Sequence, residues 1–241
     1  MRPKIGLITI GQSPRQDVVS DIVSILGPKI EIIERGALDG LSKKKMNVLH
    51  PEKNDFPLIT RLMDGSPVVI GKRKIIPLIQ KQISALDKLN VELMAFLCTD
   101  DFPGLKSQKI LLLPYPILLS MVTSMMREGT LAVLAPLKEQ KETVKRKWQK
   151  TGLEIIIEIM NPYARRRDRA ASPSPSQCSP PLGQSFKFEQ VVKNIQDHQV
   201  DLIVLDCIGY SSKVKEKIRQ ATGKSVLSPR TILARMIQEL L

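Results

Sequence analysis

Cysteine and histidine are scarce in this sequence, which has three cysteines and two histidines among 241 residues. The cysteines, Cys98, Cys178 and Cys207, are neither closely paired nor even in number. This excludes the paired spacing of a zinc site and a framework of disulfide bonds. We therefore predict no metal site and a reducing, cytoplasmic location.

Aromatic residues make up only 4% of the chain, so aliphatic side chains must fill its core. Long apolar runs are also missing. The longest, residues 110–122, is interrupted by Pro114 and Pro116 and is shorter than the roughly 20 residues that span a bilayer. The apolar segment at residues 5–10 is too short for a secretory signal and lacks a small-residue cleavage site. The sequence thus predicts neither export nor membrane insertion.

Basic side chains outnumber acidic ones, giving a formal net charge of +13, which would attract nucleic acid. The lysines are scattered, however, and no zinc-finger spacing, RNP aromatic pattern or basic recognition helix accompanies them. The one dense arginine cluster lies in residues 164–185, a Ser- and Pro-rich stretch that contains Cys178 and almost no aliphatic side chain. We predict a disordered insertion there and no nucleic-acid partner.

Short apolar runs alternate with segments of helical periodicity along the rest of the chain, as in parallel α/β folds. Two of these runs, residues 93–97 and 202–206, are each followed by a cysteine, and the two cysteines are 109 residues apart. With about four predicted strands in each half, this spacing indicates an internal duplication. We predict two lobes: residues 1–114 together with 229–241, and residues 115–228.

Cys98 and Cys207 are the main candidates for chemistry. Ligands of open α/β sheets bind beyond the carboxyl ends of the strands, so a thiol that follows a strand faces a ligand rather than the core. Our hypothesis is that the two thiols face each other across one cleft. The alternative is that both are inert strand-end residues, since free cysteine is often buried as a small hydrophobic side chain.

The loop after the first strand reads Gly-Gln-Ser-Pro-Arg. Ser13 has the pattern of a helix N-cap, with Pro14 at the first helical position and Gln16 completing a capping box. A helix over residues 14–26 would direct its N-terminal N–H groups, together with Arg15, toward a carboxylate or phosphate. The pattern needs no ligand, however, and a plain helix start explains it equally well. The Ser-Pro-Arg tripeptide recurs near the C-terminus.

Four motifs together resemble the AroM family. They are Gly-Gln-Ser-Pro-Arg at residues 11–15, Leu-Cys-Thr-x-x-Phe at 97–102, Asn-Pro-Tyr at 161–163 and Leu-Asp-Cys-x-Gly-Tyr at 205–210. This family is similar in turn to the aspartate/glutamate/hydantoin racemase superfamily. The resemblance implies an α/β fold of two pseudo-symmetric Rossmann-like lobes, each with a roughly four-stranded, mainly parallel sheet, and a cleft between them.

The resemblance also implies a mechanism. Racemases of this group use one cysteine from each lobe, on opposite faces of the substrate carbon, without a cofactor or metal, and Cys98 and Cys207 match those positions. One thiolate would act as base and the other thiol as acid. The implied ligand is a small carboxylate or amino acid, and a homodimer is a further expectation. The residues expected to bind the ligand lie beside the thiols and in the first loop: Gln12, Ser13, Arg15, Thr99, Gly209 and Tyr210.

Three departures from the racemase and AroM patterns keep a second function open. Gln12 stands where racemases usually have aspartate, and Gly209–Tyr210 where a histidine is usual. Asp100 stands where a glycine commonly follows Cys-Thr, and its charge would raise the pKa of Cys98 and repel an anionic substrate. The alternative is therefore a non-catalytic protein that binds or senses a carboxylate metabolite in the same cleft.

Overall fold

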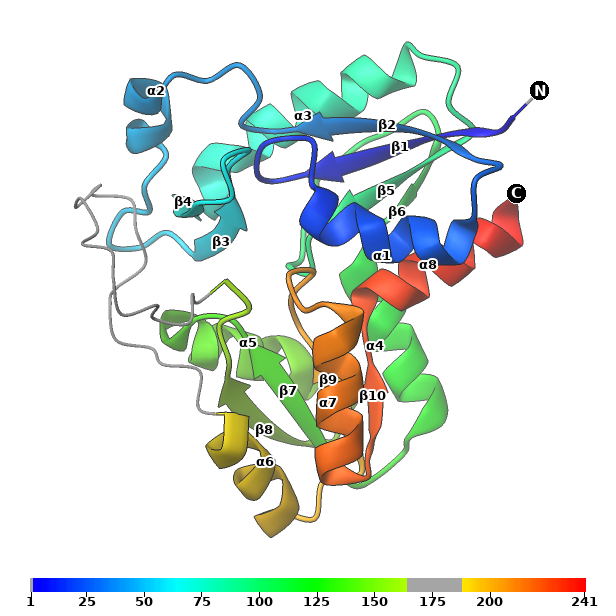
Figure 1. The fold of residues 1–241 in the computed structure, drawn as a ribbon. Coiled ribbons are helices and arrows are strands. Elements are labelled where there is room, and N and C mark those ends of the chain that lie inside the picture. The colour runs from blue at the N-terminus through cyan, green and yellow to red at the C-terminus, as the bar shows by residue number, and fades with distance from the viewer. Residues whose placement is uncertain (1, 164–187) are drawn as a thin grey trace, which may run out of the picture.

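The computed structural model describes residues 2–163 and 188–241. Figure 1 shows two lobes, one above the other, each built on its own sheet. The predicted insertion at residues 164–185, with Cys178, lies outside the described residues. None of the helices in the described part of the chain has the length and apolar character needed to cross a membrane.

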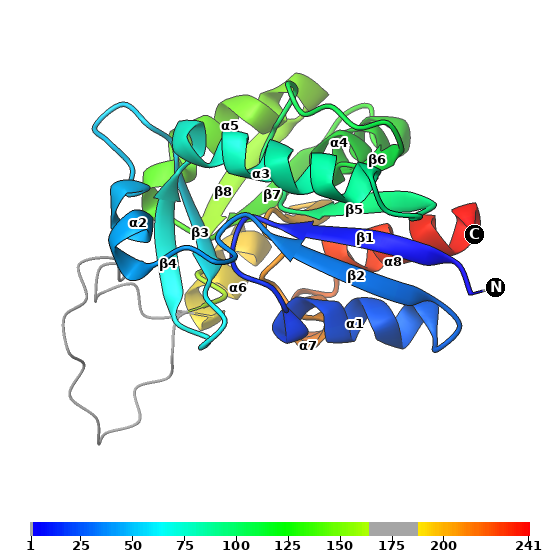
Figure 2. The ribbon, with the colours of Figure 1, turned by 90° about the horizontal axis from the view of Figure 1, so that it is seen from above.

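The upper lobe contains a parallel four-stranded sheet in the order β2-β1-β5-β6. Its inner strands are apolar on both faces because helices cover both (Figure 2). Ile8 packs in one core cluster with residues of α3, and Leu7 packs in another with residues of α1. The elements are β1 (Lys4–Thr9), α1 (Gln16–Leu26), β2 (Glu31–Gly36), α3 (Lys72–Asp87), β5 (Leu93–Leu97) and β6 (Ile110–Leu112).

The lower lobe repeats this plan with the strand order β10-β9-β7-β8, again all parallel. Helices α4 and α5 cover one face of the sheet, and α6 and α7 cover the other. Two short 3₁₀ turns, Lys138–Gln140 and Gln149–Thr151, flank α5. The elements are α4 (Pro114–Met125), β7 (Thr130–Ala135), α5 (Lys141–Trp148), β8 (Glu154–Ile159), α6 (Phe188–Asp197), β9 (Leu202–Leu205), α7 (Ser212–Thr222) and β10 (Ser225–Leu227). The predicted α/β class with two mainly parallel sheets is confirmed.

The last helix, α8 (Pro229–Leu240), follows β10 of the lower lobe but returns to the upper one, where it lies beside α1 (Figure 1). Its buried residues Leu233 and Ile237 share a core cluster with residues of α1 and β1. This helix ties the end of the second half to the beginning of the first. The boundaries of the lobes at residues 114 and 229 stay a prediction.

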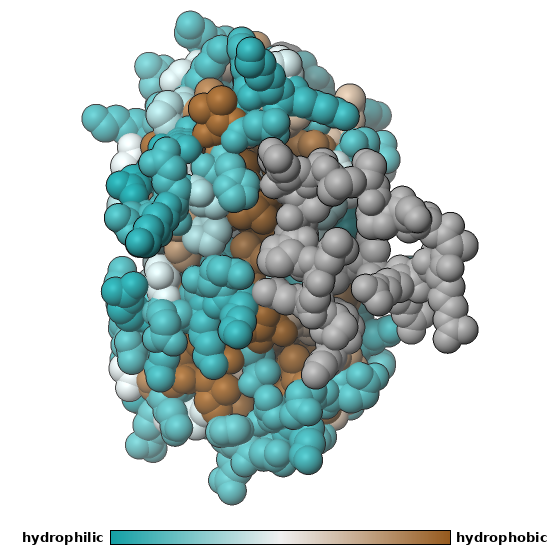
Figure 3. Space-filling model, turned by 90° about the vertical axis from the view of Figure 1, so that its left-hand side faces the viewer, coloured by the Kyte–Doolittle hydropathy of each residue, from teal (hydrophilic) through white to brown (hydrophobic). Residues whose placement is uncertain are grey.

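A two-stranded antiparallel hairpin, β3 (Pro57–Arg61) and β4 (Pro67–Gly71), follows the short helix α2 (Lys43–Val48). The hairpin belongs to the upper half of the chain but contacts the lower lobe. Ile59 shares a core cluster with lower-lobe residues, and the Gln140 side-chain amide donates to the Pro57 carbonyl at 2.6 Å. On the side of the molecule nearest the hairpin and α2, apolar side chains form a band that continues from one lobe to the other (Figure 3).

The predicted N-cap at Ser13 is wrong, and so is the capping box with Gln16. Helix α1 begins at Gln16 and has Arg15 at its N-cap, after a cis Ser13–Pro14 peptide bond. The Ser13 backbone N–H and hydroxyl both donate to the Asp39 carboxylate, at 2.8 and 2.6 Å. The helix therefore begins two residues later than predicted, and the Ser13 hydroxyl is directed toward Asp39 instead of the first N–H groups of the helix.

Candidate functional site

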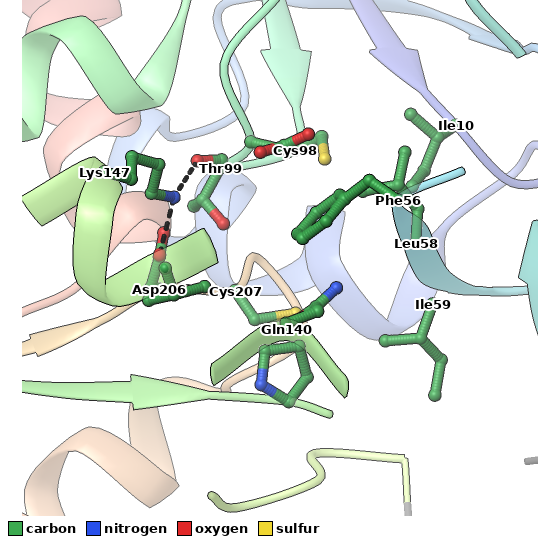
Figure 4. A pocket seen from close by; sticks show the side chains of 13 residues that line it. Ile10, Phe56, Leu58, Ile59, Cys98, Thr99, Gln140, Lys147, Asp206 and Cys207 are labelled. Carbon is green, nitrogen blue, oxygen red and sulfur yellow. Dashed lines mark hydrogen bonds and ion pairs between the residues drawn. The ribbon is translucent and has the colours of Figure 1, made fainter. Parts of the chain in front are cut away.

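Cys98 and Cys207 lie at the carboxyl ends of β5 and β9, inner strands of the two sheets. Both thiols are free, both are buried, and both line one small cavity between the lobes. The structure therefore supports the hypothesis that they share a cleft. The cavity has a volume of about 30 Å³, room for about one water molecule. In Figure 4 the ring of Phe56 projects between the two sulfur atoms.

The walls of the cavity differ in chemical character. One wall is apolar and comes mainly from the segment that leads into the hairpin and from β3, with Phe56, Leu58 and Ile59. The opposite wall carries Thr99 and Asp100 from the loop after β5, and Lys147 and Asp206 from the lower lobe. A bound molecule would therefore have polar partners on one side and aliphatic contacts on the other.

Each thiol accepts a hydrogen bond from the backbone N–H of the residue two positions further along the chain. The Gly209 N–H donates to Cys207 Sγ at 3.4 Å, and the Asp100 N–H bonds Cys98. These donors favour the thiolate form. The equivalent arrangement at both strand ends is a local sign of the duplication.

Burial opposes ionisation of both thiols. It raises the pKa of Cys207 to about 11, with Asp206 adding to the shift while the Gly209 N–H and nearby arginines oppose it. Burial also raises the pKa of Cys98, and here the charge of Asp100 contributes next, as expected from the sequence. Cys207 is thus the more easily ionised member of the pair.

A buried ion pair that the sequence did not reveal stands beside the thiols. Lys147 Nζ lies 2.6 Å from Asp206 Oδ2 and donates to the Thr99 carbonyl at 3.0 Å (Figure 4). The same Asp206 oxygen accepts from Trp148 Nε1 at 2.9 Å. Only 9% of the Lys147 side chain and 1% of the Asp206 side chain are exposed. The network links helix α5 to the loop after Cys98 and to the residue before Cys207.

Thr99 is the one predicted ligand-binding residue that lines the cavity with the two thiols. The side chains of Gln12 and Ser13 are bonded elsewhere: Gln12 to the Met63 N–H at 2.9 Å, and Ser13 to Asp39 as described. Arg15 is buried and donates to both oxygens of Asp17, at 2.8 and 2.9 Å. These polar groups hold the first loop in place.

Gly209 and Tyr210 stand behind Cys207 rather than on the cavity wall. A Cβ on Gly209 would lie 2.6 Å from the ring of Tyr163, so only glycine permits this close contact. The Tyr210 hydroxyl donates to the Met160 carbonyl. Tyr163 in turn accepts from Arg15 at 3.3 Å, which joins the Asn-Pro-Tyr motif of the lower lobe to the first loop of the upper one.

The second Ser-Pro-Arg tripeptide places Arg230 against the Cys207 loop. This buried guanidinium donates to the carbonyls of Ile208, Gly209 and Asp17, at 2.6, 2.8 and 2.7 Å, and to Asp21 Oδ2 at 2.9 Å. It therefore holds the loop of the lower lobe against α1 of the upper lobe. In the described part of the chain, no group of His, Cys, Asp and Glu side chains is arranged to hold a metal ion.

The fold is shared with solved structures of racemases and related enzymes, at low sequence identity. A Picrophilus torridus aspartate racemase superposes with a TM-score of 0.58 at 11% identity, covering 99% of this chain and 94% of that one. An arylmalonate decarboxylase gives 0.54 at 12% identity, covering 98% and 92%. A Pseudomonas putida S16 maleate isomerase gives 0.53 at 14% identity, covering 99% and 92%. The chain therefore has the two-lobed α/β fold of the racemase-like proteins.

The family model described as AroM protein matches residues 5–241, and the chain belongs to the AroM family. No protein with a curated description matches the sequence.

Proposed function

We propose that the protein catalyses cofactor-independent proton transfer at the α-carbon of a small carboxylate or amino acid, a racemase- or isomerase-type reaction. The observation that carries the proposal is the meeting of Cys98 and Cys207, from equivalent strand ends of the two lobes, at one cavity. The fold shared with racemases, a decarboxylase and an isomerase supports the same class of chemistry.

The proposed reaction starts with one thiolate and one thiol. The thiolate removes the α-proton of the substrate, and the electron pair of the C–H bond passes into an enolate-like carboxylate. The second thiol then donates its proton to the opposite face of the same carbon. The product is the other enantiomer, the roles of Cys98 and Cys207 are exchanged, and no oxidant or reductant is consumed.

Cys207 is the better candidate for the first thiolate, because its pKa is the less strongly raised of the two. The Gly209 N–H, at 3.4 Å from its sulfur, stabilises the thiolate once it forms. With a pKa of about 11 in the ligand-free protein, we expect the rate to rise steadily on the alkaline side of neutrality.

A substrate requires more room than the present cavity, since ligand sites usually enclose about 300–1,000 Å³. Phe56 occupies the space between the sulfur atoms in Figure 4 and comes directly before β3. We infer that the substrate enters when this ring and the start of the hairpin move aside. The contact between Gln140 and the Pro57 carbonyl is the hydrogen bond that such a movement breaks.

A non-catalytic protein that binds a carboxylate metabolite is the second candidate, favoured by the raised pKa of both thiols. Incubation of single enantiomers with the protein in D₂O separates the two functions. The enzyme would produce the opposite enantiomer carrying deuterium at the α-carbon, and Cys98→Ala and Cys207→Ala would each abolish racemisation. Ligand binding without α-proton exchange in the unmodified protein would contradict catalysis.

A further inference from the structure

Asp206 Oδ1 lacks a hydrogen-bond partner within the described part of the chain, although its side chain is almost fully buried. Its other oxygen, Oδ2, is bonded to Lys147 and Trp148. A buried carboxylate oxygen without a donor is destabilising, and such groups are uncommon in folded proteins. Because Asp206 lines the cavity, a ligand that brings a hydrogen-bond donor would satisfy this oxygen.

The charges around the cavity restrict what that ligand can be. Two carboxylates, Asp100 and Asp206, and one ammonium group, Lys147, are among the lining residues. Asp100 is also paired with Lys72, at 2.7 Å. A simple carboxylic acid would bring a negative charge beside these carboxylates and leave Asp206 Oδ1 without a donor. An α-amino acid brings an ammonium group for Asp206 and a carboxylate for Lys147, with no net charge.

The apolar wall restricts the ligand further. Phe56, Leu58 and Ile59 face the polar residues across the cavity and provide only aliphatic and aromatic contacts. Among the described lining residues, Lys147 alone has a cationic side chain, and the α-carboxylate of the ligand would already use it. A second carboxylate, as in aspartate or glutamate, would therefore meet an apolar surface without a cation, at a large desolvation cost.

We infer that the ligand is a zwitterionic α-amino acid with an uncharged, apolar side chain, held by the Lys147–Asp206 pair. This rests on the proposed function, whose substrate class it narrows. The ammonium group donates to Asp206 Oδ1, the carboxylate lies against Lys147, and the side chain packs on the hairpin wall. Lys147 and Asp206 are specificity-determining residues, and the thiols carry the proton transfer.

Isothermal titration calorimetry with matched ligands tests this assignment. Leucine is compared with 4-methylpentanoate, which lacks only the amino group, and with glutamate. We expect leucine to bind at least about tenfold more tightly than either, the ratio typical of one hydrogen bond to a charged group. Equal or tighter binding of 4-methylpentanoate or glutamate would overturn the inference.

Variants identify the source of the preference. The first variant is Asp206→Asn, and the second is the double variant Lys147→Met with Asp206→Asn, which leaves no unpaired buried charge. In both, the preference for leucine over 4-methylpentanoate should fall to about threefold or less. The control Asp101→Asn removes a carboxylate that pairs with Lys150 at 3.8 Å, outside the cavity lining, and should retain it. A preference kept by the double variant would also overturn the inference, and near-ultraviolet circular dichroism checks that each variant is folded.

Proton exchange in D₂O, measured on the same samples, separates failure of the inference from failure of the proposed function. Amino acids that bind with an Asp206-dependent preference but keep their α-proton would overturn catalysis and leave the ligand assignment standing. If amine-free carboxylates bind as tightly as amino acids and exchange their α-protons, the ligand assignment is overturned and the proposed catalysis stands. Absence of binding by every member of the panel would overturn the ligand assignment.

Discussion

Arg230 joins the Cys207 loop to the upper lobe, and its replacement by methionine should weaken both the fold and the site. Methionine keeps much of the length of the side chain but cannot donate. The change removes this donor from the carbonyls of Ile208 and Gly209, from the Asp17 carbonyl, which keeps its bond within helix α1, and from Asp21 Oδ2. Because Arg230 is only 1% exposed, the smaller methionine side chain also leaves part of the buried space of the arginine unfilled.

The magnitude follows from the groups left without a donor. Each unsatisfied buried carbonyl costs about 1–3 kcal/mol, and the low end applies where water can reach the loop. The side chain of Asp21 is 23% exposed and keeps a bond from the Ser212 N–H at 2.8 Å, so it adds little. The two loop carbonyls, of Ile208 and Gly209, at about 1 kcal/mol each give a loss of about 2 kcal/mol in the free energy of unfolding.

Urea unfolding, followed by the fluorescence of the single tryptophan, Trp148, measures this loss as a lower midpoint at constant slope. Arg219→Met is the matched control, since Arg219 is 57% exposed and pairs with Glu216 on the surface of α7. It should leave the urea midpoint almost unchanged, because an ion pair this exposed adds little to stability. If Arg230→Met proves as stable as this control, the proposed anchoring of the loop is refuted.

Four further predictions concern the packing and the chemistry around the thiols. Gly209→Ala should lower stability by about 1–3 kcal/mol, because the new Cβ would lie 2.6 Å from the Tyr163 ring; an unchanged thermal midpoint would contradict this contact. Alkylation by iodoacetamide, resolved by peptide mass spectrometry, should be slow at pH 7 and accelerate toward pH 11, with Cys207 reacting before Cys98; the reverse order would contradict the pKa directions. The same ionisation should reduce stability as the pH rises from 9 to about 11, since folding favours the protonated Cys207 thiol. Phe56→Ala should speed alkylation of Cys207 at fixed pH by widening the cavity, and equal rates would indicate that the ring does not control access.

The features that could be predicted from the sequence are those set by local pattern. Short apolar segments, such as Leu202–Leu205 and residues 5–8 within Lys4–Thr9, form strands because both faces of each sheet are covered. The position of Cys98 and Cys207 follows from the same pattern, since each residue comes just after a buried strand. Parallel strands bring such ends to one edge of a sheet, and the duplication brings the two edges together.

The features that could not be predicted depend on contacts between distant segments. The sequence around Ser13 is typical of a helix N-cap. In the structure, however, the Asp39 carboxylate, 26 residues further along the chain, accepts hydrogen bonds from the Ser13 hydroxyl and N–H. Lys147 is one of 37 basic residues, and nothing in the periodicity of its helix distinguishes it until Asp206 lies beside it. The only available signals were the carboxylate directly before Cys207 and the single tryptophan next to Lys147.

The repeated Ser-Pro-Arg tripeptide shows the same limit. Both copies lie at helix starts, and both arginines are buried. Both arginines lie in the upper lobe and contact the lower one: Arg15 through Tyr163, and Arg230 through the carbonyls of Ile208 and Gly209. The repeat is visible in the sequence, but the partners of the two arginines in the other lobe are a consequence of the three-dimensional arrangement.

The central claim is that Cys98 and Cys207 act on opposite faces of one substrate carbon, and exchange by single-thiol variants tests it most directly. Each enantiomer of an accepted amino acid is incubated in D₂O with Cys98→Ala and with Cys207→Ala, and loss of the α-proton signal is followed by NMR. The two variants should exchange opposite enantiomers, and neither should produce racemate. Exchange of the same enantiomer by both variants, or racemisation by either one, would contradict the claim.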